Sequence, residues 1–402
     1  MKLTIHRGTH QIGGCVTEIT TATTRIFLDF GAELPGPNGE IRQETLSIPG
    51  LTEGNPRCDG VFFTHAHGDH MGNIHRILPA VPLYMGKAAR AISLVLNQQL
   101  DTVMNRERQL AAFQRAHIFT AGEAISVGDI TVTPIWVDHS AFDSYMFLID
   151  ADGIRVLHTG DFRGHGRYGC SLPRALHTYA KNVDWLITEG TMLSRPHENV
   201  RSEWELSEEA GKILKKHQRV FVLCSSTNID RIHTFCRANP DRRPIVCDRY
   251  QKNVLDTAVN NAPGWLNGYD FRQVIPDSPR NQKLHEWMDE KGFLMFVRAN
   301  DHFRKRMEFC KGSCKVIYSM WNGYREGPMQ NARIVDFLDG FDVIPLHTSG
   351  HVTPTDLRRV YEGVRPRRGV IPMHTENPEG FQRIIPAEKL RFLRDGETFL
   401  LD

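Results

Sequence analysis

The densest group of potentially reactive side chains in this sequence of 402 residues lies between positions 65 and 70. His65, His67, Asp69 and His70 follow directly on an apolar run over 61–63, which is typical of a buried strand. A strand that ends in this way would project imidazoles and a carboxylate into one small space. Neutral imidazole and carboxylate suit zinc, with manganese or iron as weaker candidates. Isolated surface histidines are common among the 19 of this chain, but four ligands at this spacing favour a metal site.

The same arrangement recurs three times further along the chain. His139 follows an apolar-rich strand predicted over 130–137, and Asp161 and His374 each follow a shorter apolar segment. Each places histidine or aspartate where a strand meets a loop. Such edges hold side chains on rigid supports, which a metal site requires.

The segments that must position these residues read first as a mixed sheet with helices. A helix is predicted after Asp69 and a longer one over 86–106. Short strands joined by glycine-rich turns are predicted over residues 3–5, 16–19, 25–29, 61–64, 130–137, 145–149, 155–158 and 185–188.

From about residue 198, strands and helices alternate regularly. Ser202 as N-cap and Glu205 three residues later predict a helix to residue 217. The alternation continues as a strand over 220–224, a helix over 228–238, and further elements over 293–297, 316–319 and 331–338, which indicates parallel αβ units. Beyond residues 342–346 the histidine-rich loop pattern returns. We therefore predict one domain made of 1–197 and 344–402, with 198–343 inserted into it.

The amino-acid composition does not indicate a particular kind of binding partner. The 49 basic and 47 acidic side chains give a net charge of +2, so attraction to a polyanion would need a local patch. The opening residues lack the apolar core of a signal peptide, and no apolar run is long enough to span a bilayer. The eight cysteines show no paired spacing, so we expect free thiols in a cytoplasmic protein that does not enter a membrane. The sequence leaves the oligomeric state open, a homodimer included.

With these motifs, the sequence resembles the β-CASP nuclease branch of the metallo-β-lactamase fold, to which ribonuclease J belongs. The histidine-rich motif alone would imply only the fold. The inserted αβ segment and the late motifs Ser349-Gly350-His351 and Pro372-Met373-His374 narrow the resemblance to the β-CASP branch. It covers essentially the whole chain, and it implies an α/β fold: a metallo-β-lactamase αββα sandwich with an inserted β-CASP αβ domain.

The resemblance also implies a site for two zinc ions, with manganese as an alternative. Asp29 matches the early aspartate of the fold, which would orient a metal ligand. Asp138 and His158 match no ligand position, so a structural role is expected for both. The implied ligands are His65, His67 and His139 for one ion, Asp69, His70 and His374 for the other, and Asp161 as the bridge.

Such a site suits phosphodiester hydrolysis. Two metal ions roughly 3.5–4 Å apart can activate water near neutral pH and stabilise both sides of an in-line displacement. His351 matches the histidine that protonates the departing sugar oxygen, and Glu189 matches its acidic partner, which would raise the histidine's pKa and fix its tautomer. With Asp69, these are the predicted catalytic residues. Gly190 stands where family members commonly carry serine.

Substrate contacts are predicted in the inserted segment and just after it. Ser226 and Thr227 lie between a predicted strand and helix, where hydroxyls and a helix N-terminus could bind a phosphate. Plain N-capping requires the same residue types, so both interpretations stay open. Ser349 would add a hydroxyl beside His351. Basic clusters at 304–306, 358–359 and 365–368 could follow a nucleic-acid backbone, although such runs are more often solvated faces.

The resulting hypothesis is a zinc-dependent ribonuclease that acts on single-stranded RNA and leaves 5′-phosphate ends. The RNA preference follows from the resemblance, since His374 stands where the RNA-acting members carry histidine. One alternative is a DNA nuclease of the same fold. Others are a hydrolase of a small thioester, lactone or cyclic phosphodiester, against which the insertion argues, and a non-catalytic binding protein, against which the full set of ligands argues. Endonuclease and 5′-exonuclease modes share these residues.

Overall fold

A computed structural model of the chain describes residues 1–36, 40, 42–100, 103–195, 197–240 and 243–402. These residues form two compact units, each with its own sheets and helices. The first unit comprises Met1–Leu34, Arg42–Glu198 and Gly350–Asp402, and the second is chiefly Asn199–Ser349. Each unit is described separately below.

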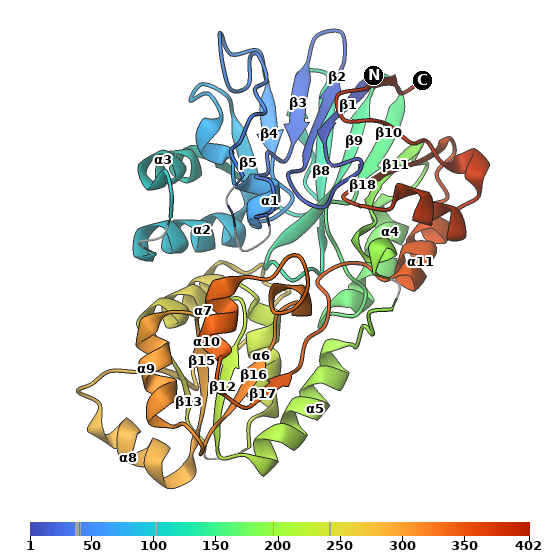
Figure 1. Ribbon diagram of the computed structural model, residues 1–402. Helices are drawn as coiled ribbons and strands as arrows, with labels where there is room; N and C mark the ends of the chain where they lie inside the picture. Colours follow the sequence, from blue (N-terminus) through green and yellow to red (C-terminus); the bar gives the residue numbers. More distant parts are fainter. Residues whose placement is uncertain (37–39, 41, 101–102, 196, 241–242) are drawn as a thin grey trace. The chain divides into compact units, whose positions relative to one another are not determined.

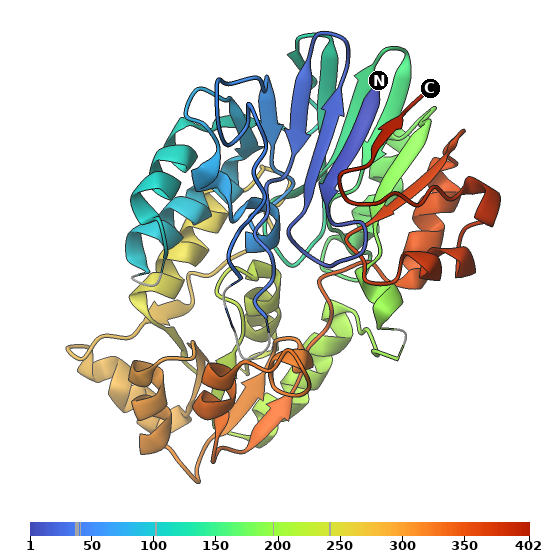
Figure 2. The same cartoon turned by 45° about the horizontal axis from the view of Figure 1, so that its top comes forward.

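The first unit contains two sheets. In the first sheet, β1 (Lys2–Arg7) pairs antiparallel with both β19 (Thr398–Leu400) and β2 (Val16–Thr20), so the two termini lie close together (Figures 1 and 2). The remaining strands continue the order β2-β3-β4-β5-β6, with parallel pairing from β3 onward: β3 (Arg25–Leu28), β4 (Gly60–Phe62), β5 (Leu83–Gly86) and β6 (His117–Phe119).

The second sheet of this unit has the order β18-β11-β10-β9-β8-β7. Its strands are β18 (Gly369–Met373), β11 (Trp185–Glu189), β10 (Ile154–His158), β9 (Ser144–Ala151), β8 (Ile130–Val137) and β7 (Ile125–Val127). The strands β18, β11 and β10 are parallel to one another, whereas the pairs β10–β9, β9–β8 and β8–β7 are antiparallel. The carboxyl ends of β18, β11 and β10 therefore meet at one edge.

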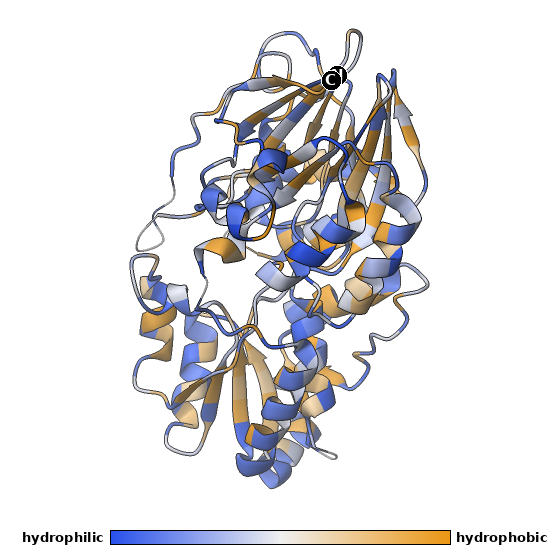
Figure 3. Cartoon of the chain, turned by 90° about the vertical axis from the view of Figure 1, so that its right-hand side faces the viewer, coloured by the Kyte–Doolittle hydropathy of each residue, from blue (hydrophilic) through white to orange (hydrophobic). Residues whose placement is uncertain are grey.

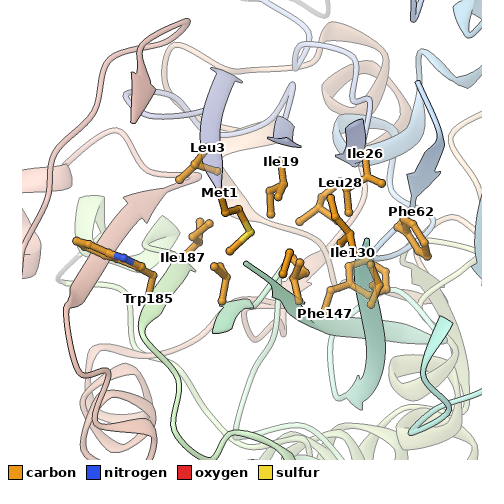
Figure 4. Close-up of a cluster of buried hydrophobic side chains, with 14 of the residues drawn as sticks. Met1, Leu3, Ile19, Ile26, Leu28, Phe62, Ile130, Phe147, Trp185 and Ile187 are labelled. Atoms are coloured by element: carbon orange, nitrogen blue, oxygen red, sulfur yellow. The ribbon is translucent and has the colours of Figure 1, made fainter. Parts of the chain in front are cut away.

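Alternation along the strands buries both faces of this second sheet. Phe147 and Ile149 of β9 join the cluster between the two sheets, where Figure 4 shows them among side chains of the first sheet. Met146 and Leu148 point to the opposite face, because successive side chains of a strand alternate. There they pack with residues of α4 (Leu172–Tyr179) and α11 (Pro354–Val364).

The outer face of the first sheet is covered in the same way. Phe27, Val61 and Leu83 pack with Met71 of α1 (Gly68–Met71) and Phe113 of α3 (Arg106–Arg115). A third helix, α2 (Lys87–Gln99), precedes α3. The order of layers is helix, sheet, sheet, helix, which confirms the predicted αββα sandwich.

The second unit is a parallel αβ sheet. Its strand order is β14-β13-β15-β12-β16-β17, and every neighbouring pair is parallel, as the alternating pattern predicted. The strands are β12 (Arg219–Leu223), β13 (Ile245–Cys247), β14 (Val274–Pro276), β15 (Phe293–Val297), β16 (Lys315–Tyr318) and β17 (Val343–Pro345). They appear as an apolar layer in Figure 3.

Helices of the second unit alternate with these strands. Ser202 and Glu205 form the predicted capping box at the start of the first of them. The helices are α5 (Glu203–Lys216), α6 (Ile229–Ala238), α7 (Arg249–Asn261), α8 (Gln282–Lys291), α9 (Asp301–Phe309) and α10 (Ala332–Leu338). Short 3₁₀ turns occur in both units, at Ile74–Arg76, Gly169–Ser171, Thr191–Ser194, Asn322–Tyr324, Pro378–Arg383 and Ala387–Lys389. Within the described ranges, no helix is long and apolar enough to cross a membrane.

Two predicted segments differ from the structure. The helix predicted over 86–106 ends at Gln99, because Leu100 is extended, and a separate helix begins at Arg106; residues 101–102 lie outside the described residues. The inserted domain was predicted to end at 343, whereas β17 continues to Pro345 and pairs with β16. A three-residue strand carries too little periodicity to locate that end from sequence.

The lack of a side chain at Gly31 allows α1 to approach the loop that follows Asp29. A Cβ added at Gly31 would lie 1.7 Å from the carbonyl oxygen of Asp69 and 2.9 Å from the amide nitrogen of Cys15. We expect Gly31→Ala to lower the free energy of unfolding by about 1–3 kcal/mol or more, because the backbone must move apart. Urea denaturation would measure this. Gly264→Ala is the matched control, since nothing lies within 4 Å of its added Cβ; equal midpoints for the two variants would contradict the prediction.

Candidate metal centre

The predicted ligands of the first unit, and Asp29, which was predicted to orient one of them, lie where strands end. Asp29 directly follows β3, and His374 directly follows β18. His139 follows β8 by two residues, and Asp161 follows β10 by three. His65 follows β4, and the remaining residues of that motif enter α1. The structure brings these positions together into one cluster, although they span more than 300 residues of sequence.

One side of the cluster is a group of three imidazoles. His65, His67 and His139 present nitrogens that all lie within 4.8 Å of one another, and their ring centroids are 4.7–4.9 Å apart. The Nδ1 atom of His67 faces the Nε2 atom of His139 at 3.2 Å. Three nitrogens that converge in this way could ligate one ion.

Asp161 occupies the middle of the cluster. Its Oδ2 atom lies 3.2 Å from Nε2 of His70, 3.8 Å from Nε2 of His65 and 3.9 Å from Nε2 of His139. Its Oδ1 atom lies 3.7 Å from Nδ1 of His374. One carboxylate therefore faces both groups of histidines, which is the geometry of a bridging ligand.

The other side of the cluster combines a carboxylate with two imidazoles. Oδ2 of Asp69 lies 3.3 Å from Nε2 of His374 and 4.0 Å from Nε2 of His70. The rings of the two histidines are 5.1 Å apart. His374 adopts a left-handed backbone with φ of +48°, which is strained for a residue with a side chain and is common at functional sites.

The fit of this cluster to cations is tested by its buried polar atoms. Nε2 of His65, Nε2 of His70 and both carboxylate oxygens of Asp161 are inaccessible to solvent and, apart from the 3.2 Å approach of His70 Nε2 to Asp161 Oδ2, make no hydrogen bond. Buried polar groups are ordinarily satisfied, and leaving several unpaired is costly. Metal ions placed among these atoms would satisfy all of them, so the residues present fit a divalent-metal site.

Protonation states of His65, His67 and Asp161 agree with this interpretation. Burial and the neighbouring histidines hold the pKa of His65 well below its usual value, and burial lowers the pKa of His67 to about 4. Both imidazoles are therefore neutral at pH 7, the form that binds metals. Burial alone would raise the pKa of Asp161, but His374 and His70 outweigh it and hold that pKa well below its usual value. The carboxylate is thus ionised. For His70, burial lowers the pKa, but the charges of Asp161 and Asp29 outweigh burial and raise that pKa well above its usual value while no metal is bound.

Asp29 orients the ring of His70 through a hydrogen bond to the nitrogen that does not face the cluster. His70 donates from Nδ1 to Oδ2 of Asp29 at 2.7 Å, which turns Nε2 into the cluster. The amide and hydroxyl of Thr64 donate to the same carboxylate at 2.7 and 2.8 Å. Because the hydroxyl of Thr64 donates to Asp29, it accepts from Nδ1 of His65, 3.0 Å away. One buried aspartate thereby orients two histidines, the arrangement expected behind metal ligands.

Two further supports were not predicted from the sequence. His139 donates from Nδ1 to the carbonyl of Gly350 at 2.6 Å. The hydroxyl of Thr191 donates to the carbonyl of His374 at 3.2 Å and lies 2.8 Å from its Nδ1. A threonine and a backbone carbonyl carry no sequence signal for such roles. Cys15 also belongs to this cluster and was likewise not predicted.

His351 and Glu189 lie beside the cluster as a pair. Nδ1 of His351 is 3.0 Å from Oε2 of Glu189 and 3.6 Å from Oδ2 of Asp161. Glu189 is buried and also accepts from the amides of Phe162 and Val352. Burial alone would lower the pKa of His351, but the charges of Glu189 and Asp161 raise it to about 9. The His351 side chain remains 20 % exposed, so it can meet a substrate.

Asp138 and His158 have partners away from the cluster. Asp138 accepts from Nε of Arg163 at 2.8 Å and from the amide of Tyr168 at 2.6 Å. Nδ1 of His158 accepts from the amide of Gly160, and burial lowers the pKa of this histidine to about 4.

The predicted substrate residues Ser226, Thr227 and Ser349 lie in the second unit. The N-cap of α6 is Asn228, whose side chain accepts from the amide of Arg231 at 3.0 Å. The hydroxyl of Thr227 instead lies 3.1 Å from that of Ser225. The capping role that competed with phosphate binding is thus filled by the next residue.

This fold and this cluster define a metal-dependent hydrolase. Residues 24–247, more than half of the chain, match the model of the β-lactamase superfamily domain. The chain belongs to that family. A crystal structure of a protein of unknown function from Enterococcus faecalis V583 has the same fold, with a TM-score of 0.75 at 22% identity over 99% of both chains.

Curated relatives agree with the predicted branch. A ribonuclease J from Sinorhizobium meliloti is 25% identical over 94% of this chain and 69% of its own length. A ribonuclease J from Helicobacter pylori is 26% identical over 64% of this chain but 38% of its own length. The transcription termination factor FttA of Methanothermobacter thermautotrophicus is 23% identical over 79% of this chain and 51% of its own length. The predicted resemblance to ribonuclease J-like nucleases is confirmed.

Proposed function

We propose that this chain is a ribonuclease that hydrolyses phosphodiester bonds of single-stranded RNA and leaves 5′-phosphate ends. The observation that carries the proposal is Asp161, which faces two separate groups of histidines while the His351–Glu189 pair stands beside it. The ribonuclease J relatives support RNA as the substrate.

Two divalent ions would occupy the cluster. His65, His67 and His139 would hold one, Asp69, His70 and His374 the other, and Asp161 would bridge them. Nitrogen and oxygen donors favour zinc, with manganese as the alternative. When bound, such ions supply an activated water near neutral pH and stabilise the charge that develops on both sides of phosphorus.

The protein's own groups would then handle the leaving group. Departure of the 3′-oxygen requires a proton, which His351 would deliver. Glu189 would hold this ring by the bond to Nδ1, so the proton that is transferred would be carried on Nε2. Loss of the 3′-oxygen leaves the phosphate on the 5′ side of the following nucleotide, which accounts for the proposed product.

Substrate contacts in the second unit belong to the same proposal. Ser226 and Thr227 precede a ten-residue helix whose capping is done by Asn228, so their hydroxyls can serve a phosphate at the helix N-terminus. Ser349 would contribute a further hydroxyl next to His351 in sequence.

A competition between strands tests the proposal. Labelled single-stranded RNA and DNA of one sequence, each with 5′-hydroxyl and 5′-phosphate ends, are incubated with the zinc-loaded protein at moderate salt. We expect faster cleavage of RNA and 5′-phosphate products. His351→Ala protein loaded in the same way is the control for a contaminating nuclease. Equal or faster cleavage of DNA would refute the RNA preference, and 5′-hydroxyl products would refute the assigned leaving group.

A further inference from the structure

The backbone of Cys15 is hydrogen-bonded to two segments of the candidate metal centre. It directly precedes β2. Its amide donates to the carbonyl of Asp69 at 3.0 Å, and its own carbonyl accepts from the amide of Gly31 at 3.0 Å. The backbone of Cys15 therefore connects α1, which contains Asp69 and His70, to the loop that follows Asp29.

The side chain of Cys15 faces the same cluster. The residue is 1% exposed, and its sulfur lies in a group with donor nitrogens of His70 and His374, all within 4.8 Å of one another. Gly8 closes the other side, because a Cβ added there would lie 3.5 Å from the sulfur. The carbonyl of Gly8 also accepts from the amide of His374 at 2.6 Å.

Atoms that lack partners point to a ligand at this position. Nε2 of His70 and both oxygens of Asp161 are buried and, apart from the 3.2 Å approach of Nε2 to Oδ2, make no hydrogen bond. Six of the eight free cysteines are buried, yet in the described part of the chain Cys15 is the one grouped with histidine nitrogens. Ordinary packing of a thiol, which would account for the other five, does not require that neighbourhood.

We propose that Cys15 contributes its thiolate as an additional ligand to the ion held by Asp69, His70 and His374. Zinc binds thiolate at about 2.3 Å and imidazole at about 2.0–2.1 Å, so ligand atoms around one ion lie roughly 3–4 Å apart. On binding, the thiol releases its proton to solvent and the sulfur shares an electron pair with the ion. This inference rests on the proposed metal centre.

Cobalt substitution tests the inference through absorption. The metal-free protein is titrated with Co²⁺, which gives visible bands from any ligand set and a near-ultraviolet charge-transfer band only from thiolate. We expect this near-ultraviolet band in the unaltered chain, its loss in Cys15→Ser and Cys15→Ala, and its retention in Cys58→Ser, which removes a buried cysteine that bonds to the carbonyl of Gly60.

The possible results distinguish a failure of the Cys15 assignment from a failure of the proposed metal centre as a whole. Cobalt that binds with visible bands but without the near-ultraviolet band would overturn the role of Cys15 and leave the metal centre standing. No uptake of cobalt would overturn both. A band that survives in both Cys15 variants would also overturn the assignment. Absence of the band from the unaltered chain would overturn the role of Cys15 even where a variant does not fold.

Discussion

Replacing Asp161 with alanine should remove most of the bound metal and, with it, the hydrolytic activity. Asp161 is the residue whose carboxylate faces His65, His70 and His139 within 3.9 Å, so its loss removes a donor from both proposed ions at once. It also leaves the proposed ion held by His65, His67 and His139 without any carboxylate to offset its charge. Elemental analysis should give about two equivalents of zinc for the unaltered chain and well under one for the variant.

Asp143→Asn is the matched control for removing a buried carboxylate. Asp143 is also buried in the first unit, but its carboxylate accepts from the amides of Ala88 and Ala89 and from the hydroxyl of Tyr145, not from the cluster. We expect this control to keep its metal. Circular dichroism would show whether each variant is folded. A folded Asp161→Ala protein with a full metal content would contradict the bridging role.

The local part of the site was predictable because its proposed ligands follow strands. A strand ends in a defined direction, so histidine and aspartate at several strand ends can meet at one edge of a sandwich. That argument reached His65, His139 and His374 from sequence alone. Asp29, whose bond to His70 spans 41 positions, was instead predicted through the family resemblance.

Residues without a chemical signature could not be found in this way. Thr191 and Gly350 act through a hydroxyl and a backbone carbonyl that every protein contains in many copies. Cys15 lies in the loop before β2, and its neighbourhood arises only when β18 and α1 fold against that loop. Short elements such as β17 and β19 are recognised by their pairing partners, which a local pattern does not contain.

His351→Ala should keep its metal and lose turnover by about 10²–10⁴-fold, the contribution expected of a general acid. The residue makes no metal contact in the proposed ligand set, and its Nδ1 atom is bonded to Glu189 at 3.0 Å. Single-turnover kinetics on labelled RNA would measure the chemical step apart from product release. An unchanged single-turnover rate, with metal content equal to that of the unaltered chain, would remove His351 from the mechanism.

A double variant separates the role of Glu189 from that of the metal centre. If Glu189 acts by holding His351, Glu189→Gln should reduce the rate less than His351→Ala, and the double variant should be no slower than His351→Ala alone. Independent roles would instead multiply the two losses. Glu189 also accepts from the amides of Phe162 and Val352, which flank Asp161 and His351 in sequence, so Glu189→Gln must be shown to keep its metal. Losses that multiply in a fully metallated double variant would show that Glu189 does not act through His351.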